Sequence, residues 1–322
     1  MKAAYAHRFS PDSPLDGLMV GQRPERVASA GWSTVTVRAA ALNGHDLWAL
    51  RGVGLDQASL PRILGSDAAG IDQHGNEVII YPVIGPGGPV RTGGIQPVTG
   101  SLLSERHDGT LAERVLVPTA NLLPKPAAMT FAQAAALPTA WLTAYRMLFT
   151  LSGATPGEVV LVQGSTGGVA SALLALGSAA GLRMWATGRS AAKRELAIGF
   201  GAERTFETGQ RLPHRVNAVM ETVGAATWDH SMKVLRPGGT LVVAGATAGH
   251  TPPLELRRVF SLGLRIVGTR MGTFDEFTSL LAFCETAGIA PHIDSIHPLD
   301  RTVDGLARLD SGDAVGKIII TP

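Results

Sequence analysis

Residues 159–170 read VVLVQGSTGGVA, and this stretch decides the fold that we predict for the chain. Its first residues form a short apolar run rich in β-branched side chains, which is typical of a buried strand. A glycine-rich turn and a run of small residues follow, and the run predicts a helix up to Ala180. This order presents backbone N–H groups and a helix N-terminus to a pyrophosphate. The alternative is a tight turn that only packs the helix on a sheet. The candidate nucleotide contacts are Gly164, Ser165, Thr166, Gly167, Gly168 and Val169.

Downstream of this turn, strand patterns alternate with helical patterns. We expect strands at 183–187, 217–222, 241–244 and 264–268, and helices at 191–199, 228–235 and 274–287. Such alternation predicts right-handed crossovers and a doubly wound parallel α/β sheet.

The first 125 or so residues have a different pattern. Short β-like runs at 2–7, 33–42, 63–71, 77–81 and 111–117 are separated by turns, as in a partly open barrel. One helical turn is expected at 46–51, and residues 82–99 read as a loop rich in Gly and Pro. The pattern changes at Thr130, a predicted N-cap with Gln133 three residues on, and Pro138 predicts a kink.

Composition limits the classes of function. The chain has 322 residues, enough for two domains, and a formal charge of +2, too small to indicate nucleic acid or a membrane surface as partner. Its single cysteine, Cys284, excludes an internal disulfide and a cysteine-based zinc cluster. No run reads as a signal peptide or a membrane span, so we expect a cytoplasmic protein.

Several motifs, taken in order, give the chain a resemblance to a known superfamily. They are AAALNGHDLWALRG (39–52), ILGSDAAG (63–70), DGTLAERVLVP (108–118), NLLPKP (121–126), AAALPTAWLTAY (134–145), the glycine turn and LRPGGTLVVAG (235–245). Together they resemble the medium-chain dehydrogenase/reductase superfamily, and within it the zinc-free quinone oxidoreductases.

The resemblance implies a fold of two domains. A GroES-like, partly open β-barrel forms the catalytic domain (1–125), and a Rossmann domain follows (126–262). The last segment (263–322) ends the Rossmann sheet and returns to the catalytic domain, with the active cleft between the two. Relatives have a longer stretch with a helix where this chain has residues 205–216, so we expect a sheet trimmed at one edge.

The resemblance also predicts that no metal is bound. Zinc-dependent members carry a cysteine where this chain has Asn43, and a histidine followed by an acid where it has Ser66 and Asp67. Neither Asn43 nor Ser66 is a usual zinc ligand. The four-cysteine lobe of the family is replaced by the short loop at 82–105. Acceptors that need no strong Lewis acid are therefore favoured, namely quinones and polarised carbon–carbon double bonds.

The end of the second Rossmann strand indicates the cofactor. Enzymes that prefer NAD place an acid there to bind the ribose hydroxyls. This chain has Gly188, followed by Arg189, Ser190 and Lys193, which suit a 2′-phosphate and favour NADPH. The alternative is a solvated helix start whose basic residues face water.

Further site residues follow from the resemblance. Thr143 is expected near the nicotinamide, Gly245, Ala246 and Thr247 along its ribose, and Arg270, Met271 and Gly272 near its carboxamide. The catalytic candidates are Asn43, His45 and Asp46. In zinc-free relatives the asparagine and the aspartate order the substrate wall, and His45 could supply a proton, unless it is an ordinary hydrogen-bonding histidine. Trp48 and Tyr81 are candidates for an aromatic wall.

The sequence therefore predicts an NADPH-dependent reductase of quinones or α,β-unsaturated carbonyl compounds. Two alternatives stay open: an enoyl-thioester reductase, and a non-catalytic, crystallin-like or regulatory protein that binds NADPH. The resemblance further implies a homodimer formed through the last Rossmann strand, around 264–267.

Overall fold

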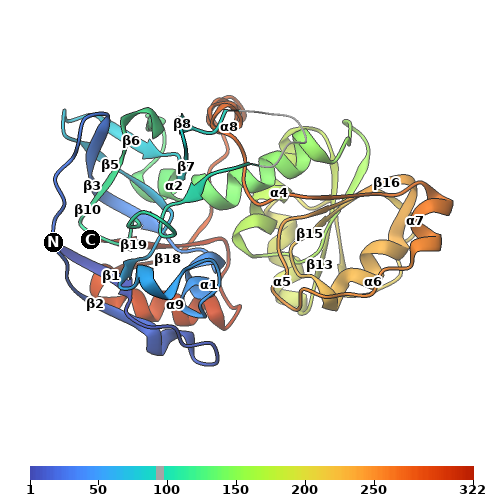
Figure 1. Cartoon of the computed structure of the whole chain (residues 1–322). Helices are drawn as coiled ribbons and strands as arrows, with labels where there is room; N and C mark the ends of the chain where they lie inside the picture. Colours follow the sequence, from blue (N-terminus) through green and yellow to red (C-terminus); the bar gives the residue numbers. More distant parts are fainter. Residues whose placement is uncertain (92–97) are drawn as a thin grey trace. The chain divides into compact units, whose positions relative to one another are not determined.

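The computed structural model describes residues 1–91 and 98–322 and contains two compact units (Figure 1). Unit 1 consists of Met1–Arg91, Thr99–Ala140 and Thr273–Pro322, and unit 2 is built on Trp141–Gly272. The predicted loop at 82–99 contains two short strands, β7 (Val83–Gly85) and β8 (Gly88–Pro89), while its residues 92–97 lie outside the described residues.

Unit 2 is a doubly wound parallel sheet, as predicted. Its strands follow the order β14–β13–β12–β15–β16–β17, and all neighbours are parallel. The strands are β12 (Val159–Val162), β13 (Arg183–Gly188), β14 (Arg204–Glu207), β15 (Val216–Glu221), β16 (Leu235–Val243) and β17 (Arg265–Gly268). The helices are α3 (Leu142–Tyr145), α4 (Gly168–Ala179), α5 (Ala191–Gly199), α6 (Ala225–Val234) and α7 (Leu256–Leu262).

The prediction of a trimmed sheet edge is wrong. Strand β14 pairs with β13 in parallel, and the ring of Phe206 lies 5.2 Å from that of Trp185. This apolar contact stabilises the pairing of the short segment with the sheet. The segment between β14 and β15 contains no helix.

Unit 1 is built mainly on a seven-stranded sheet. Its order is β11–β6–β5–β3–β19–β18, with β10 also paired to β3. These strands are β3 (Trp32–Ala41), β5 (Asp67–Asp72), β6 (Glu77–Ile80), β10 (Arg114–Pro118), β11 (Leu122–Pro124), β18 (Ile293–Pro298) and β19 (Lys317–Thr321). Because β19 pairs antiparallel with β3, the C-terminal segment returns to the N-terminal part of the chain, as the resemblance implies. This return of the chain and the sheet order agree with the GroES-like fold that the resemblance implies.

Smaller elements complete unit 1. A three-stranded sheet has the order β2 (Leu18–Gln22), β1 (Lys2–Ala6), β4 (Arg62–Ile63), and β7 pairs with both β8 and β9 (Ser101–Leu102). The predicted strand at 63–71 is therefore two strands, β4 and β5, in different sheets. The helices are α1 (Gly44–Leu50), α2 (Phe131–Ala135), α8 (Phe274–Ala287) and α9 (Thr302–Asp310).

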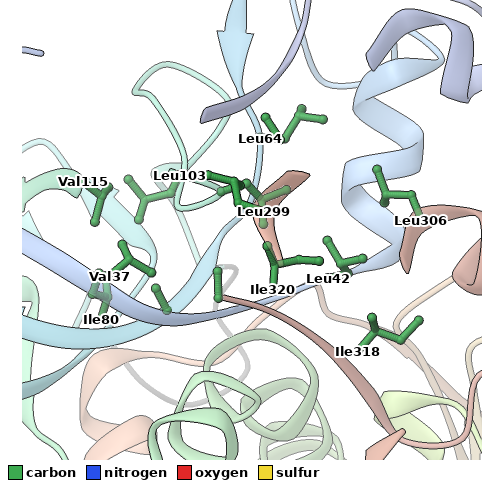
Figure 2. Packing of buried hydrophobic residues seen from close by; sticks show 14 of the residues in the cluster. Val37, Leu42, Leu64, Ile80, Leu103, Val115, Leu299, Leu306, Ile318 and Ile320 are labelled. Carbon is green, nitrogen blue, oxygen red and sulfur yellow. The ribbon is translucent and has the colours of Figure 1, made fainter. Parts of the chain in front are cut away.

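The core of unit 1 joins residues from both ends of the chain. Figure 2 shows Leu42 near Leu306, Ile318 and Ile320, which come from the C-terminal segment, while Val37 lies beside Ile80 in the same cluster. All of these side chains are buried, and burial of apolar surface is the main favourable contribution to folding. The C-terminal segment therefore stabilises the region that carries Asn43.

The ends of two helices lie where the sequence predicts them. Thr130 and Gln133 form the predicted capping box at the start of α2, and α8 has the predicted bounds. A π-helical turn, Leu137–Trp141, occurs at the predicted kink around Pro138.

Cys284 is buried in α8, and burial raises the pKa of its thiol to about 12, as expected of a structural thiol. Among the described residues, we find no helix with the length and apolarity that a membrane crossing requires.

Candidate functional site

The turn between β12 and α4 has the geometry of an anion site. Gly164 adopts a φ of +92°, which favours glycine, and Gly167 is the N-cap of α4. No side chain caps this helix, and a Cβ on Gly167 would have no atom of the described residues within 4 Å. Uncapped N–H groups of the first turn beside open space suit a phosphate, because the helix N-terminus carries partial positive charge. Ser165 and Thr166 are buried under the turn, whereas Gly167 is exposed.

A chain of buried hydrogen bonds supports this turn. The Gly164 N–H donates to Thr187 Oγ1 (3.2 Å), and Thr187 donates to Gln163 Oε1 (2.7 Å). Gln163 Nε2 donates to Ser231 Oγ (2.9 Å), which donates to Glu221 Oε2 (2.6 Å). Gln163 is not among the residues predicted from the sequence, although a polar residue directly after an apolar strand is a usable signal.

A side chain at the end of the second Rossmann strand would displace its neighbours. A Cβ on Gly188 would lie 2.9 Å from both Ser165 Oγ and Arg194 Cγ. Arg194 itself donates from Nη1 to the Gly188 carbonyl (3.0 Å) and from Nη2 to Glu207 Oε1 (3.2 Å). Arg194 is thus the cation that contacts this strand end, whereas Arg189 is an exposed residue.

Ser190 is the N-cap of α5, as its place in the sequence allows. Its Oγ accepts a hydrogen bond from the Lys193 N–H at 3.3 Å. The hydroxyl proton stays available to a ligand, because capping uses only an oxygen lone pair.

The remaining predicted cofactor residues lie after other strands of the same parallel sheet. Gly245, Ala246 and Thr247 follow β16, and Arg270, Met271 and Gly272 follow β17. Parallel strands bring their carboxyl ends to one edge, so these residues share an edge with the turn after β12. Thr143 is buried on α3, and Met271 is buried as well. Unit 2 therefore offers backbone groups, a serine hydroxyl and cations that fit a dinucleotide.

In unit 1, a buried polar cluster forms around Asp67. Asn43 Nδ2 donates to Asp67 Oδ2 at 2.8 Å, and Ser66 Oγ donates to Oδ1 at 3.2 Å. Thr139 donates to the same Oδ1 and lies 3.0 Å from Ser66 Oγ. Lys317 Nζ donates to Asn43 Oδ1 (2.5 Å) and lies 3.4 Å from Asp67 Oδ2. We call these five residues the Asp67 cluster.

The sequence analysis missed two members of the Asp67 cluster. Thr139 lies in the quoted motif at 134–145, but no signal singled it out. Lys317 opens the last strand, where a lysine usually faces solvent. In the structure its side chain is 3% exposed, and burial lowers its pKa while Asp67 and Asp46 oppose that shift.

The three catalytic candidates have different surroundings. Asp46 accepts hydrogen bonds from the backbone N–H groups of Asn43 and Gly65, both at 2.9 Å, and so orders the start of α1. Burial raises the pKa of Asp46, against lowering by those hydrogen bonds and by His45. Nε2 of His45 is buried and has no hydrogen-bond partner in the described part of the chain. Asn43 is almost buried, and its Nδ2 and Oδ1 are engaged within the cluster.

The prediction of Tyr81 as part of an aromatic wall is wrong. Its side chain has no exposed surface and packs edge-to-face against Phe274, with ring centres 5.5 Å apart. Apolar packing against α8 therefore determines its position. Trp48 is half-buried on α1 and stays a candidate.

The Asp67 cluster does not fit a zinc ion. Zinc is held by thiolate, imidazole or carboxylate groups, and a catalytic site needs three of them. The cluster has one carboxylate, an amide and two hydroxyls, and an ammonium already lies against the carboxylate. No other set of three His, Cys, Asp or Glu residues that could hold a metal occurs among residues 1–91 and 98–322.

A cavity of about 290 Å³ lies elsewhere on unit 1. Its walls include Arg26, Trp32, His107 and Arg114, and none of the predicted site residues. Arg26 and Arg114 are already paired with Asp108 and Glu25. We therefore treat the turn between β12 and α4 in unit 2 and the Asp67 cluster in unit 1 as two separate candidate sites.

Comparison with known proteins gives two family matches. Residues 29–127 match the alcohol dehydrogenase GroES-like domain, and residues 168–286 match the zinc-binding dehydrogenases. The second match covers unit 2 from the start of α4 onward and α8 up to residue 286, and it includes no residue of the Asp67 cluster.

Individual proteins resemble the chain over most of its length. It is 32% identical over 306 residues to the 2-methylene-furan-3-one reductase of Solanum lycopersicum, covering 89% of this chain and 71% of that protein. It is 27% identical over 309 residues to the quinone oxidoreductase of Mus musculus, covering 89% and 88%. A solved NAD-dependent alcohol dehydrogenase superposes with a TM-score of 0.91 at 28% identity, covering 100% of both chains.

Proposed function

Because the chain belongs to the medium-chain dehydrogenase/reductase superfamily of oxidoreductases, we propose that it transfers hydride from NADPH to a quinone or an α,β-unsaturated carbonyl compound. The observation that carries this proposal is that one chain contains both a dinucleotide-type turn, in unit 2, and a polar cluster whose donors do not suit zinc, in unit 1. Bound NADPH would supply the hydride, and the protein would bind and orient both reactants.

The choice of NADPH rests on the end of β13. Gly188 stands where the acid that binds the NAD ribose hydroxyls would be expected, and any side chain there would displace Ser165 or Arg194. Ser190 offers a hydroxyl proton, and Arg189 and Lys193 offer positive charge, to a 2′-phosphate. These features favour the phosphorylated cofactor.

The choice of acceptor rests on the Asp67 cluster. Without a Lewis acid, a simple ketone or aldehyde would develop a localised alkoxide. A quinone or an enone spreads the charge over a conjugated system and needs less stabilisation. The two relatives named as a quinone oxidoreductase and as a reductase of a methylene-furanone act, by name, on acceptors of this conjugated type.

Thermal unfolding with each nucleotide tests the cofactor. Saturating NADPH should add on the order of 3–4 kcal/mol of apparent stability, and NADH at the same concentration much less. Arg189→Ala should weaken NADPH binding by about 10-fold and leave NADH binding unchanged, since it removes one contact to a charged group. Equal protection by NADH would contradict the proposal.

Gly167→Asp is a matched test of the turn. Its backbone, at φ −66°, accepts any residue, and a Cβ has open space. An N-cap aspartate stabilises a helix, so the melting temperature should hold or rise. The same carboxylate would repel the pyrophosphate, and NADPH protection should disappear.

NADPH oxidation with a panel of quinones, enones and enoyl thioesters tests the reaction. Turnover with quinones or enones supports the proposal, and turnover with thioesters alone would replace it by the enoyl-thioester alternative. Binding of NADPH without turnover on any acceptor would favour the non-catalytic alternative.

We also propose that the chain forms a homodimer through β17. This strand ends the sheet of unit 2, and its residue Ile266 is exposed. An edge strand with free N–H and C=O groups can pair with a second copy around a two-fold axis, which continues the sheet. Phe260 on α7, which precedes this strand in the chain, is 73% exposed and offers apolar surface to the same partner.

A further inference from the structure

Lys317 is the single cation among the five residues of the Asp67 cluster, and its surroundings identify its charge state. Nζ lies 2.7 Å from the Leu42 carbonyl oxygen, 2.5 Å from Asn43 Oδ1 and 3.4 Å from Asp67 Oδ2. All three neighbours are acceptors, and an ammonium has three N–H donors, one for each. A neutral amine would have two donors and would leave one of these buried oxygens without a hydrogen.

The Asp67 cluster contains the two residues that replace zinc ligands in the resemblance to zinc-dependent relatives, and Lys317 contacts one of them, Asn43. Asn43 and Ser66 stand where such relatives have a cysteine and a histidine, and Asp67 stands where they have the following acid. In this chain Asn43 Oδ1 turns toward Lys317, so that Nδ2 faces Asp67. The ammonium therefore determines which end of the Asn43 amide faces the carboxylate.

We propose that the Lys317 ammonium is the resident cation of the Asp67 cluster, and that it excludes a divalent metal from this centre in addition to the missing ligands. The fixed charge neutralises Asp67 and repels a second cation at contact distance. Lys317 is thus a positioning residue that acts through Asn43 and Asp67. This inference concerns the metal chemistry of the centre and does not depend on which acceptor is reduced.

Cobalt binding separates the effect of Lys317 from that of the missing ligands. Asn43, Ser66 and Thr139 meet around Asp67, so a variant with Asn43→Cys, Ser66→His and Thr139→Cys gains three metal donors in one place. A second variant carries these changes together with Lys317→Met, which removes the charge at similar length. Co²⁺ is titrated into each protein and followed by its thiolate charge-transfer and ligand-field absorption.

We expect the variant with Lys317→Met to bind one equivalent of Co²⁺ at least 10-fold more tightly than the variant that keeps Lys317. The matched control adds Lys125→Met instead, since Lys125 is a buried lysine outside the cluster, and it should leave Co²⁺ affinity unchanged. Equal affinity with and without Lys317 would overturn the inference, and so would failure of both proteins to bind. Protection by NADPH against heat reports that unit 2 of each variant is folded.

A second measurement uses single and double changes, in case the multiple variants do not fold. Lys317→Met alone leaves the Asp67 carboxylate buried without a counter-charge, which strongly destabilises proteins. Adding Asp67→Asn removes the orphaned charge, so the double variant should melt at a higher temperature than Lys317→Met alone. Additive effects of the two changes would mean that the charges do not interact, and would overturn the inference.

Discussion

At the scale of single residues, Asp294 links a hydrogen-bond network to stability in acid. Its carboxylate accepts hydrogen bonds from Arg308 (2.7 Å) and from the Val315 N–H (2.9 Å). Burial alone would raise the pKa of Asp294, but these hydrogen bonds and one from Ser295 hold that pKa at about 2. A carboxyl with a lowered pKa stabilises the folded state above its unfolded pKa of about 4. That contribution is lost as the pH falls from about 4 toward 2.

We therefore predict that Asp294→Asn lowers the free energy of unfolding at pH 7 by about 1 kcal/mol, after allowance for solvent screening of the pair with Arg308. The variant should also lose less stability than the natural chain between pH 5 and pH 3. Urea unfolding at these pH values measures both effects. The control is Asp229→Asn, which removes an exposed pair with Lys233 and should change nothing measurable.

His45 carries the residue-scale prediction about catalysis. Its Nε2 is buried without a hydrogen-bond partner in the described ranges, so its proton is not committed elsewhere in the protein. If His45 supplies the proton that follows hydride transfer, its removal should lower kcat and change how kcat depends on pH. We expect both effects in His45→Ala. A pH–rate profile that His45→Ala leaves unchanged removes His45 from the reaction.

At the scale of elements, α4 packs closely on β13. A Cβ on Gly177 of α4 would lie 2.3 Å from Met184 Sδ of β13, and both residues are buried. Alanine normally stabilises a helix interior by about 1 kcal/mol relative to glycine. Here we predict that Gly177→Ala destabilises the protein by about 1–3 kcal/mol, since the buried methionine has to move.

Gly199→Ala in α5 is the control for this prediction. A Cβ there meets no described atom within 4 Å, so the change should be neutral or slightly stabilising. Chemical denaturation of both variants measures the difference. A stabilised Gly177→Ala protein would show that the helix does not need the close approach to the strand.

At the scale of the whole molecule, β17 determines the predicted assembly. We expect the natural chain to have the mass of two chains in light scattering after size exclusion. Ile266→Lys places a charge on the edge strand of each copy, and like charges that meet across a two-fold axis should yield monomers. The control is Val303→Lys, which changes an exposed apolar residue of α9 in unit 1. A natural chain that is monomeric at all concentrations contradicts the dimer.

The sequence by itself determined the local structure and the class of fold. The apolar run, glycine turn and helix at 159–180 follow from side-chain size and period, and the capping box at Thr130 follows from two residues three positions apart. These signals are local, because a turn or a cap is stabilised by neighbours in sequence. The sequence also shows directly that residues 43 and 66 are an asparagine and a serine, which are not usual zinc ligands.

Only the tertiary structure decided which residues meet. Lys317 and Asn43 lie 274 positions apart, and their contact exists because β19 pairs with β3. The same holds for the burial of Tyr81 against α8 and for the joining of β14 to β13 through Phe206 and Trp185. Strand pairing and core packing bring distant residues into contact, and the period of a single segment does not encode those partners. The position of the Lys317 ammonium beside Asp67 is therefore known only from the tertiary structure.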